Sequence, residues 1–208
     1  IEPSRGLGDV YKRQSETHSM NETRKKYGIS DGGNMLLAVG RLAARKGHGL
    51  LLRAFSKVAE STNSHLVIIG RGSLKRRLNR MSERLGISDR VTIESGMGFE
   101  QISEMYRFSQ LCVYPSYYEG QGLIPLEAMS SGIPVLTVNN GPLPEMVDET
   151  VGALFELGSV DSLSEAIASE LSSNESLNQK GAEGRQRVLD RFTPVSYTHL
   201  TLPTSPHV

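Results

Sequence analysis

The interior of the chain alternates short apolar runs with longer amphipathic stretches. The runs at 35–40, 65–70 and 111–114 are almost entirely apolar and too short for buried helices, which predicts strands covered on both faces. The stretch at 48–61 has apolar residues at every third or fourth position, which is typical of a helix that packs one face on a core. The same criteria predict further strands at 90–95, 133–138 and 152–156, and further helices at 73–86, 100–109, 161–173 and 175–192, with one more that begins near Gly122.

Strands and helices that alternate at this spacing predict crossover connections and therefore a mostly parallel sheet. The predicted fold class is α/β, a doubly wound, Rossmann-like sheet with helices on both faces, and one domain accounts for the interior. In such folds ligands bind outside the carboxyl ends of the strands. The glycine-rich and charged segments follow predicted strands, at Gly40–Arg41, Gly70–Gly72, Gly96 and 115–122, so a ligand site is expected along that edge.

The two ends of the chain lack the periodicity of the interior. Residues 1–14 and 193–208 resemble translated adapter sequence, and we interpret them as foreign to the natural protein, with the folded domain at 15–192. A pair of genuine disordered tails is the alternative, which their Pro, Ser and Thr content also permits. If the ends are foreign, the natural protein is expected to extend further in both directions.

Composition disfavours several classes of protein. Lys and Arg together number 23, as do Asp and Glu, so the formal net charge is zero. This balance argues against non-specific binding of nucleic acid, which requires a surplus of cations. No apolar run approaches the ~20 residues that a transmembrane helix needs. The single cysteine, Cys112, lies in an apolar run, where a buried core residue is favoured over a nucleophile, and its isolation fits a reducing, cytoplasmic compartment.

Several familiar motifs fail on inspection. The segment at 70–75 opens like a dinucleotide fingerprint but has Lys75 where the third glycine belongs, and the segment at 40–47 lacks the glycine and hydroxyl residue of a P-loop. His48 and His65 are interpreted as surface or helix-start residues, because no histidine or cysteine neighbour stands at metal-ligand spacing. No metal site is therefore predicted, and no G-x-S-x-G elbow supports a hydrolase.

Two cations and two carboxylates remain on the expected ligand edge. Arg41 follows the first strand and Lys46 precedes the first long helix, which suits a diphosphate, although solvated side chains are the commoner case for single residues. The helix that begins near Gly122 would direct free N–H groups at the same place. Glu119 and Glu127 would repel phosphate and are therefore expected to accept hydrogen bonds from sugar hydroxyls. A nucleoside diphosphate sugar offers this arrangement of groups.

The segments VGRLAARKG, VIIGRG, YPSYYEGQGLIPLEAMSSGIPV and NNGPLPEMV, in this order, closely resemble the C-terminal donor-binding domain of retaining GT-B glycosyltransferases of the group 1 (family four) type. The resemblance covers about residues 21–192, and the Glu-x7-Glu pattern within EGQGLIPLEAM is its specific part. It implies that residues 15–192 bind a nucleotide-diphosphate sugar and form one half of a GT-B enzyme. It also implies a hexosyl or other glycosyltransferase that needs no metal and no cofactor besides its nucleotide-sugar substrate.

The resemblance also assigns roles to residues. Arg41 and Lys46 would hold the diphosphate and stabilise the leaving group, Glu119 would face the donor sugar, and Glu127 would bind the ribose hydroxyls. Gly122 and Leu123 would contribute backbone N–H groups, and Met97 would contact the base. The catalytic residues are thus predicted as Glu119, Arg41 and Lys46, and the donor-binding residues as Gly40, Arg41, Lys46, Met97, Glu119, Gly120, Gly122, Leu123 and Glu127.

Two departures from the family pattern bear on function. Gln121 replaces an aromatic residue that is common in the family, which is expected to change the packing of the loop and the sugar preference. An N-terminal acceptor domain is absent before residue 21, so this chain alone is predicted to bind a donor without transferring sugar. A nucleotide-sugar binding module without transferase activity, or a GT-B nucleotide-sugar epimerase, are the alternatives.

Peripheral association with the cytoplasmic face of a membrane is left open by the sequence. The basic residues at 75–84 could contact anionic lipid, but a solvated helix face is the favoured interpretation.

Overall fold

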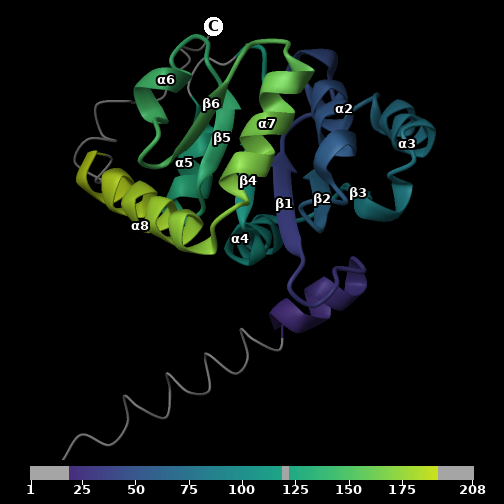
Figure 1. Cartoon of the computed structure of the whole chain (residues 1–208), viewed down its shortest axis with the longest axis horizontal. Coiled ribbons are helices and arrows are strands. Elements are labelled where there is room, and N and C mark those ends of the chain that lie inside the picture. The colour runs from purple at the N-terminus through teal and green to yellow at the C-terminus, as the bar shows by residue number, and fades with distance from the viewer. Residues whose placement is uncertain (1–18, 119–121, 192–208) are drawn as a thin grey trace, which may run out of the picture.

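Six short segments form one sheet in the computed structural model, which describes residues 19–118 and 122–191 (Figure 1). Every neighbouring pair of strands is parallel, and the strand order is β3-β2-β1-β4-β5-β6. This order confirms the predicted doubly wound α/β fold, because the chain first adds strands on one side of β1 and then returns to add them on the other. The strands are β1 Asn34–Val39, β2 Ser64–Ile69, β3 Val91–Glu94, β4 Leu111–Tyr114, β5 Val135–Val138 and β6 Gly152–Phe155.

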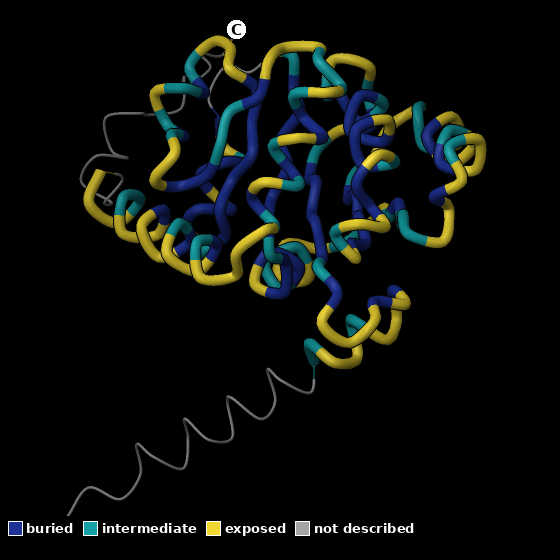
Figure 2. Tube along the Cα trace, viewed as in Figure 1, coloured by how far each residue is buried: buried dark blue, intermediate teal, exposed yellow. Residues whose placement is uncertain are grey.

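The sheet is covered on both faces, and alternate residues of each central strand enter different cores. In β1, Leu36 and Ala38 belong to one buried cluster, whereas Met35 and Leu37 belong to the other. Figure 2 shows the central strands largely buried, with exposed residues on the outer helices. The first cluster is covered by α2 His48–Val58, α3 Lys75–Arg84 and α7 Val160–Glu170. The second cluster is covered by α4 Phe99–Phe108 and α5 Leu123–Ser130. Helix α8 Asn174–Arg191 packs on α5.

Most predicted elements are confirmed, with ends that differ by a few residues. Cys112 is fully buried as predicted, and burial raises the pKa of its thiol to about 12. The strand predicted from residue 133 begins at Val135, because Pro134 has no N–H to donate to a neighbouring strand. Four short elements were not predicted: a helix at 19–26, the 3-10 turns η1 Ala44–Lys46 and η2 Ser88–Arg90, and α6 Leu143–Met146.

The C-terminal helix α8 is fastened by two charged contacts, one with the loop between α6 and β6 and one with the end of α7. Arg187 donates to both carboxylate oxygens of Asp148, at 3.0 and 3.2 Å, and Lys180 donates to Glu170 at 2.6 Å. Partial burial opposes ionisation of Asp148, but the hydrogen bonds from Arg187 and Thr150 outweigh it and lower the pKa of this carboxyl to about 2. None of the helices in the described ranges is long and apolar enough to cross a membrane.

The point where the strand order reverses lies between β1 and β4. The loop after β1 and the loop after β4 touch there: the backbone N–H of Tyr117 donates to the carbonyl of Arg45 at 2.9 Å. Gly47 packs still more closely, since a Cβ atom on it would lie 2.0 Å from the carbonyl oxygen of Pro115. Two segments far apart in the sequence are thus held together at the edge where doubly wound sheets bind ligands.

Candidate functional site

Lys46 lies directly across the switch point between β1 and β4. It ends η1, and its Nζ donates to the hydroxyl of Tyr114, the last residue of β4, at 2.9 Å. The same Nζ lies 5.4 Å from the centroid of the Tyr114 ring, within range of a cation–π contact. A half-buried ammonium group is therefore held at the carboxyl ends of the two central strands, as the sequence predicted for Lys46.

Arg41 and the start of α5 approach the same edge. The side chain of Arg41 is exposed and makes no hydrogen bond or ion pair with another residue in the described ranges. Helix α5 begins at Leu123 after Gly122, whose φ of 60° places it in the left-handed region that glycine adopts without strain. Glu119 and Gly120, which complete the predicted site, lie outside the described residues. The free N–H groups of α5 and the two cations form a setting that suits an anion.

Glu127 lies on the first turns of α5 and lines a hollow between α4 and α5. The hollow has a volume of about 280 Å³, and its other lining residues are mostly apolar, among them Val39, Ile102 and Ile124. Loss of hydration against this lining raises the pKa of Glu127, and a hydrogen bond from Tyr106 partly opposes the rise. Because the carboxyl is accessible from the hollow, it can accept hydrogen bonds from a bound hydroxylated ligand.

Tyr106 holds the Glu127 carboxylate in place and was missed by the sequence interpretation. Its ring is 2% exposed, and its hydroxyl donates to Oε2 of Glu127 at 3.2 Å. Burial strongly raises the pKa of this phenol, so the hydroxyl stays protonated and remains a donor. One signal was present in the sequence: a tyrosine on the apolar face of a predicted helix must find a partner for its hydroxyl.

A second hollow adjoins the first and contains two predicted residues. It measures about 230 Å³, and Gly40 and Met97 both line it, with Val39 and Ile102 shared between the two hollows. The structure thus brings Gly40, Met97 and Glu127 to one continuous surface, with Arg41 and Lys46 on the loop that follows Gly40.

His48 supports the loop that carries Arg41, and of its two predicted placements the helix start is confirmed while the surface is not. It begins α2 but is 3% exposed, with Nε2 3.2 Å from the carbonyl oxygen of Arg41. Burial lowers the pKa of His48 to about 4, so the ring is neutral at pH 7. A carbonyl only accepts, so Nε2 carries the proton in this contact. His65 is likewise buried rather than exposed, and its Nε2 lies 2.9 Å from Oγ1 of Thr92.

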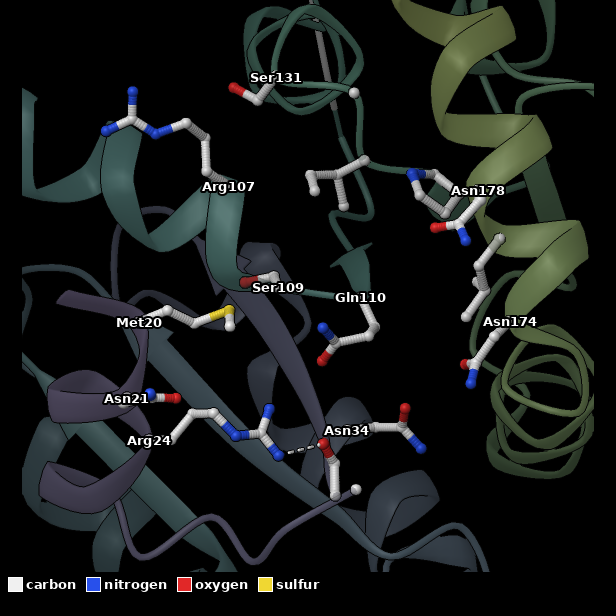
Figure 3. A pocket seen from close by; sticks show the side chains of 16 residues that line it. Met20, Asn21, Arg24, Asn34, Arg107, Ser109, Gln110, Ser131, Asn174 and Asn178 are labelled. Atoms are coloured by element: carbon white, nitrogen blue, oxygen red, sulfur yellow. Dashed lines mark hydrogen bonds between the residues drawn. The ribbon is translucent and has the colours of Figure 1, made fainter. Parts of the chain in front are cut away.

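A larger hollow lies at the opposite edge of the sheet, where the strands begin (Figure 3). It measures about 640 Å³ and is lined mainly by amide and guanidinium side chains. Two of these are already engaged: Arg24 donates to the carbonyls of Ser30 and Gly33, and Gln110 accepts from the N–H of Met35. It lies away from the carboxyl ends of the strands and contains none of the predicted site residues.

Replacing Tyr106 with phenylalanine is expected to raise the pKa of Glu127, because the hydrogen bond that stabilises its charged form is lost. The same change should lower the free energy of unfolding by about 1 kcal/mol. NMR titration of the Glu127 side-chain carboxyl carbon would measure the shift. Tyr27→Phe is the matched control, since that hydroxyl contacts Glu94 instead and the pKa of Glu127 should not move. An unchanged Glu127 titration in Tyr106→Phe would contradict the positioning role.

The fold is a doubly wound α/β sheet with a cluster of charged groups at its ligand-binding edge, and the comparisons identify the family. Residues 19–187 match the model of the glycosyl transferases group 1, so the chain belongs to that family. An uncharacterized glycosyltransferase of Methanocaldococcus jannaschii is 33% identical over 64% of this chain and 34% of its own length. The GDP-mannose-dependent alpha-(1-6)-phosphatidylinositol monomannoside mannosyltransferase of Mycolicibacterium smegmatis is 28% identical over 81% of this chain and 46% of its own.

Solved structures show the same architecture. Sucrose-phosphate synthase from Thermosynechococcus elongatus superposes with a TM-score of 0.77 at 27% identity, over 86% of this chain and 46% of that one. This confirms the Rossmann-like half of a GT-B glycosyltransferase that the sequence predicted. The chain spans less than half the length of these two curated relatives.

Proposed function

We propose that this chain binds a nucleotide-diphosphate sugar and forms the donor half of a retaining, metal-independent glycosyltransferase. A separate N-terminal domain would bind the acceptor and complete the site. The observation that carries the proposal is the placement of Lys46 against Tyr114 at the switch point, with Arg41, the start of α5 and Glu127 along the same edge.

Each group has a separate task in this proposal. Lys46 and Arg41 bind the diphosphate and stabilise the charge that develops on it as the glycosidic bond breaks. These cations take the place that a metal ion would otherwise fill. Glu127, held by Tyr106, accepts hydrogen bonds from the ribose diol, and Met97 contacts the base. Glu119 faces the donor sugar, while N–H groups of Gly122 and Leu123 contact sugar and phosphate.

Among the residues described, no three His, Cys, Asp or Glu side chains gather at a site that could hold a metal ion. Whether nucleotide binding needs a metal ion is a question for experiment. Calorimetric titration of the full chain with GDP, UDP and ADP should show one diphosphate that binds more tightly than its own nucleoside. GDP is the first to test, because one relative is named for its dependence on GDP-mannose.

The titration tests both donor binding and its independence of metal. Affinity that persists in excess EDTA supports a metal-independent diphosphate site, whereas affinity that EDTA removes contradicts it. A folded chain that binds no nucleotide would contradict donor binding itself. Transfer of sugar by this chain alone would show that the acceptor domain is not required.

A further inference from the structure

Helix α3 concentrates positive charge on a protein whose formal net charge is zero. Five of its ten residues are basic and only Glu83 is acidic. The donor site uses none of them, since it lies on the loops after β1 and β4 and on α5. The basic residues are Lys75, Arg76, Arg77, Arg80 and Arg84.

The arginines form a row on the outer face of α3. Arg76, Arg80 and Arg84 are spaced by four residues, so they follow one another along one side of the helix, and all three are exposed. None forms an ion pair with another residue in the described ranges. Like charges at this spacing destabilise a helix, and Glu83, the one carboxylate of α3, forms no ion pair with these arginines.

The opposite face of α3 is anchored, so the row has a fixed orientation. Leu78 is 3% exposed and belongs to the core beneath α2 and α7. In Figure 1, α3 lies at one flank of the molecule, with no other element over its outer side. A hollow of about 530 Å³ opens beside the row, and no carboxylate lines it; its lining is Gly72, Ser73, Lys75, Arg76, Arg77, Asn79 and Arg80.

We propose that this face of α3 binds the anionic surface of a phospholipid bilayer. A bilayer offers a dense layer of phosphate groups that a row of guanidinium groups on one face of an anchored helix can contact together. Nucleic acid is the less favoured partner, because the chain as a whole carries no cationic surplus and α3 has no aromatic residue on which a base could stack.

The contact would also orient the donor site. The N–H of Leu74 donates to the carbonyl of Leu42 at 3.2 Å, and the N–H of Leu42 donates to the carbonyl of Arg71 at 2.8 Å. These bonds join the start of α3 to the loop that carries Arg41. A bilayer bound along α3 would therefore adjoin the edge of the sheet where that loop lies, whatever ligand this edge binds.

Co-sedimentation of the full chain with vesicles tests the proposal. Vesicles of phosphatidylcholine with one third phosphatidylglycerol should bind the protein at low salt, and binding should fall as salt rises. The triple variant Arg76→Gln, Arg80→Gln, Arg84→Gln should bind about a hundredfold more weakly, since each cation near such a surface contributes roughly fivefold. Circular dichroism and thermal unfolding would establish that the variant is folded.

A second triple variant removes the same charge elsewhere. Arg107→Gln, Arg185→Gln and Arg191→Gln replace exposed arginines on α4 and α8 and should leave vesicle binding within twofold of the original. An equal loss in both triple variants would mean that net charge alone attracts the protein, and would overturn the proposal. So would equal binding to pure phosphatidylcholine, absence of binding, or tighter binding to single-stranded DNA than to the vesicles at the same salt.

Discussion

Replacing Lys46 with alanine is expected to weaken the binding of a nucleoside diphosphate by ten- to a hundredfold. The Nζ of Lys46 is held 2.9 Å from the Tyr114 hydroxyl, so the ammonium reaches the switch point with little freedom left to lose on binding. A hydrogen bond between two charged groups contributes about 1.5–3 kcal/mol, which corresponds to this range. Calorimetric titration of the original and variant chains with the same diphosphate would measure the change.

Two controls make this result specific to the phosphates. The affinity for the nucleoside without phosphate should be unchanged in Lys46→Ala, because Lys46 is not expected to contact the base or the ribose. Lys25→Ala removes an exposed lysine from the helix at 19–26, at the opposite edge of the sheet, and should bind the diphosphate as the original chain does. If Lys46→Ala weakens nucleoside and diphosphate equally, Lys46 supports the loop instead of binding phosphate.

Replacing Gly47 with alanine should destabilise the protein by about 2–5 kcal/mol. With φ at 70°, Gly47 is in the left-handed region, which costs a residue with a side chain about 1–2 kcal/mol. The new Cβ would also lie 2.0 Å from the carbonyl oxygen of Pro115, and relief of that overlap would cost about 1–3 kcal/mol more. Unfolding in urea, followed by circular dichroism, would measure the loss.

Gly158 offers a matched control for the Gly47 variant. It has a similar φ of 76°, but a Cβ atom there would meet nothing within 4 Å. Gly158→Ala should therefore show only the conformational cost of about 1–2 kcal/mol. The difference between the two variants isolates the close approach of the two loops, and equal losses would mean that the loop after β4 moves aside freely.

The sheet was predictable because its signals are local. The apolar runs that became β1, β2 and β4 could be recognised by length and composition alone, and their parallel arrangement followed from the helices between them. The elements that were missed are short and lack periodicity: α6 has four residues and begins beside a proline. Their conformation depends on packing, which a single sequence does not display.

The site was predictable only in part, because the role of some of its residues also depends on packing. Arg41, Lys46 and Glu127 stand out as charges at the ends of apolar runs, and the family resemblance assigned their roles. Tyr106 and His48 resemble core residues in the sequence, because their function depends on which polar group lies opposite each ring. Glu127 is 21 residues from Tyr106, and Arg41 is 7 residues from His48. Only the folded chain shows these pairs.

The pairing of β1 with β4 has a consequence for how the site arises during folding. Leu36 is in register with Leu111, so the central pair of strands joins segments separated by the whole of α2, β2, α3, β3 and α4. Closing so long a loop is entropically costly, and contacts of this kind form late. A chain in which only the first three strands have associated would already contain Arg41 and Lys46 but not their binding surface. On the proposed function, affinity for a nucleotide would be acquired only when the two halves of the sheet have met, and a bound nucleotide would selectively stabilise the completed fold.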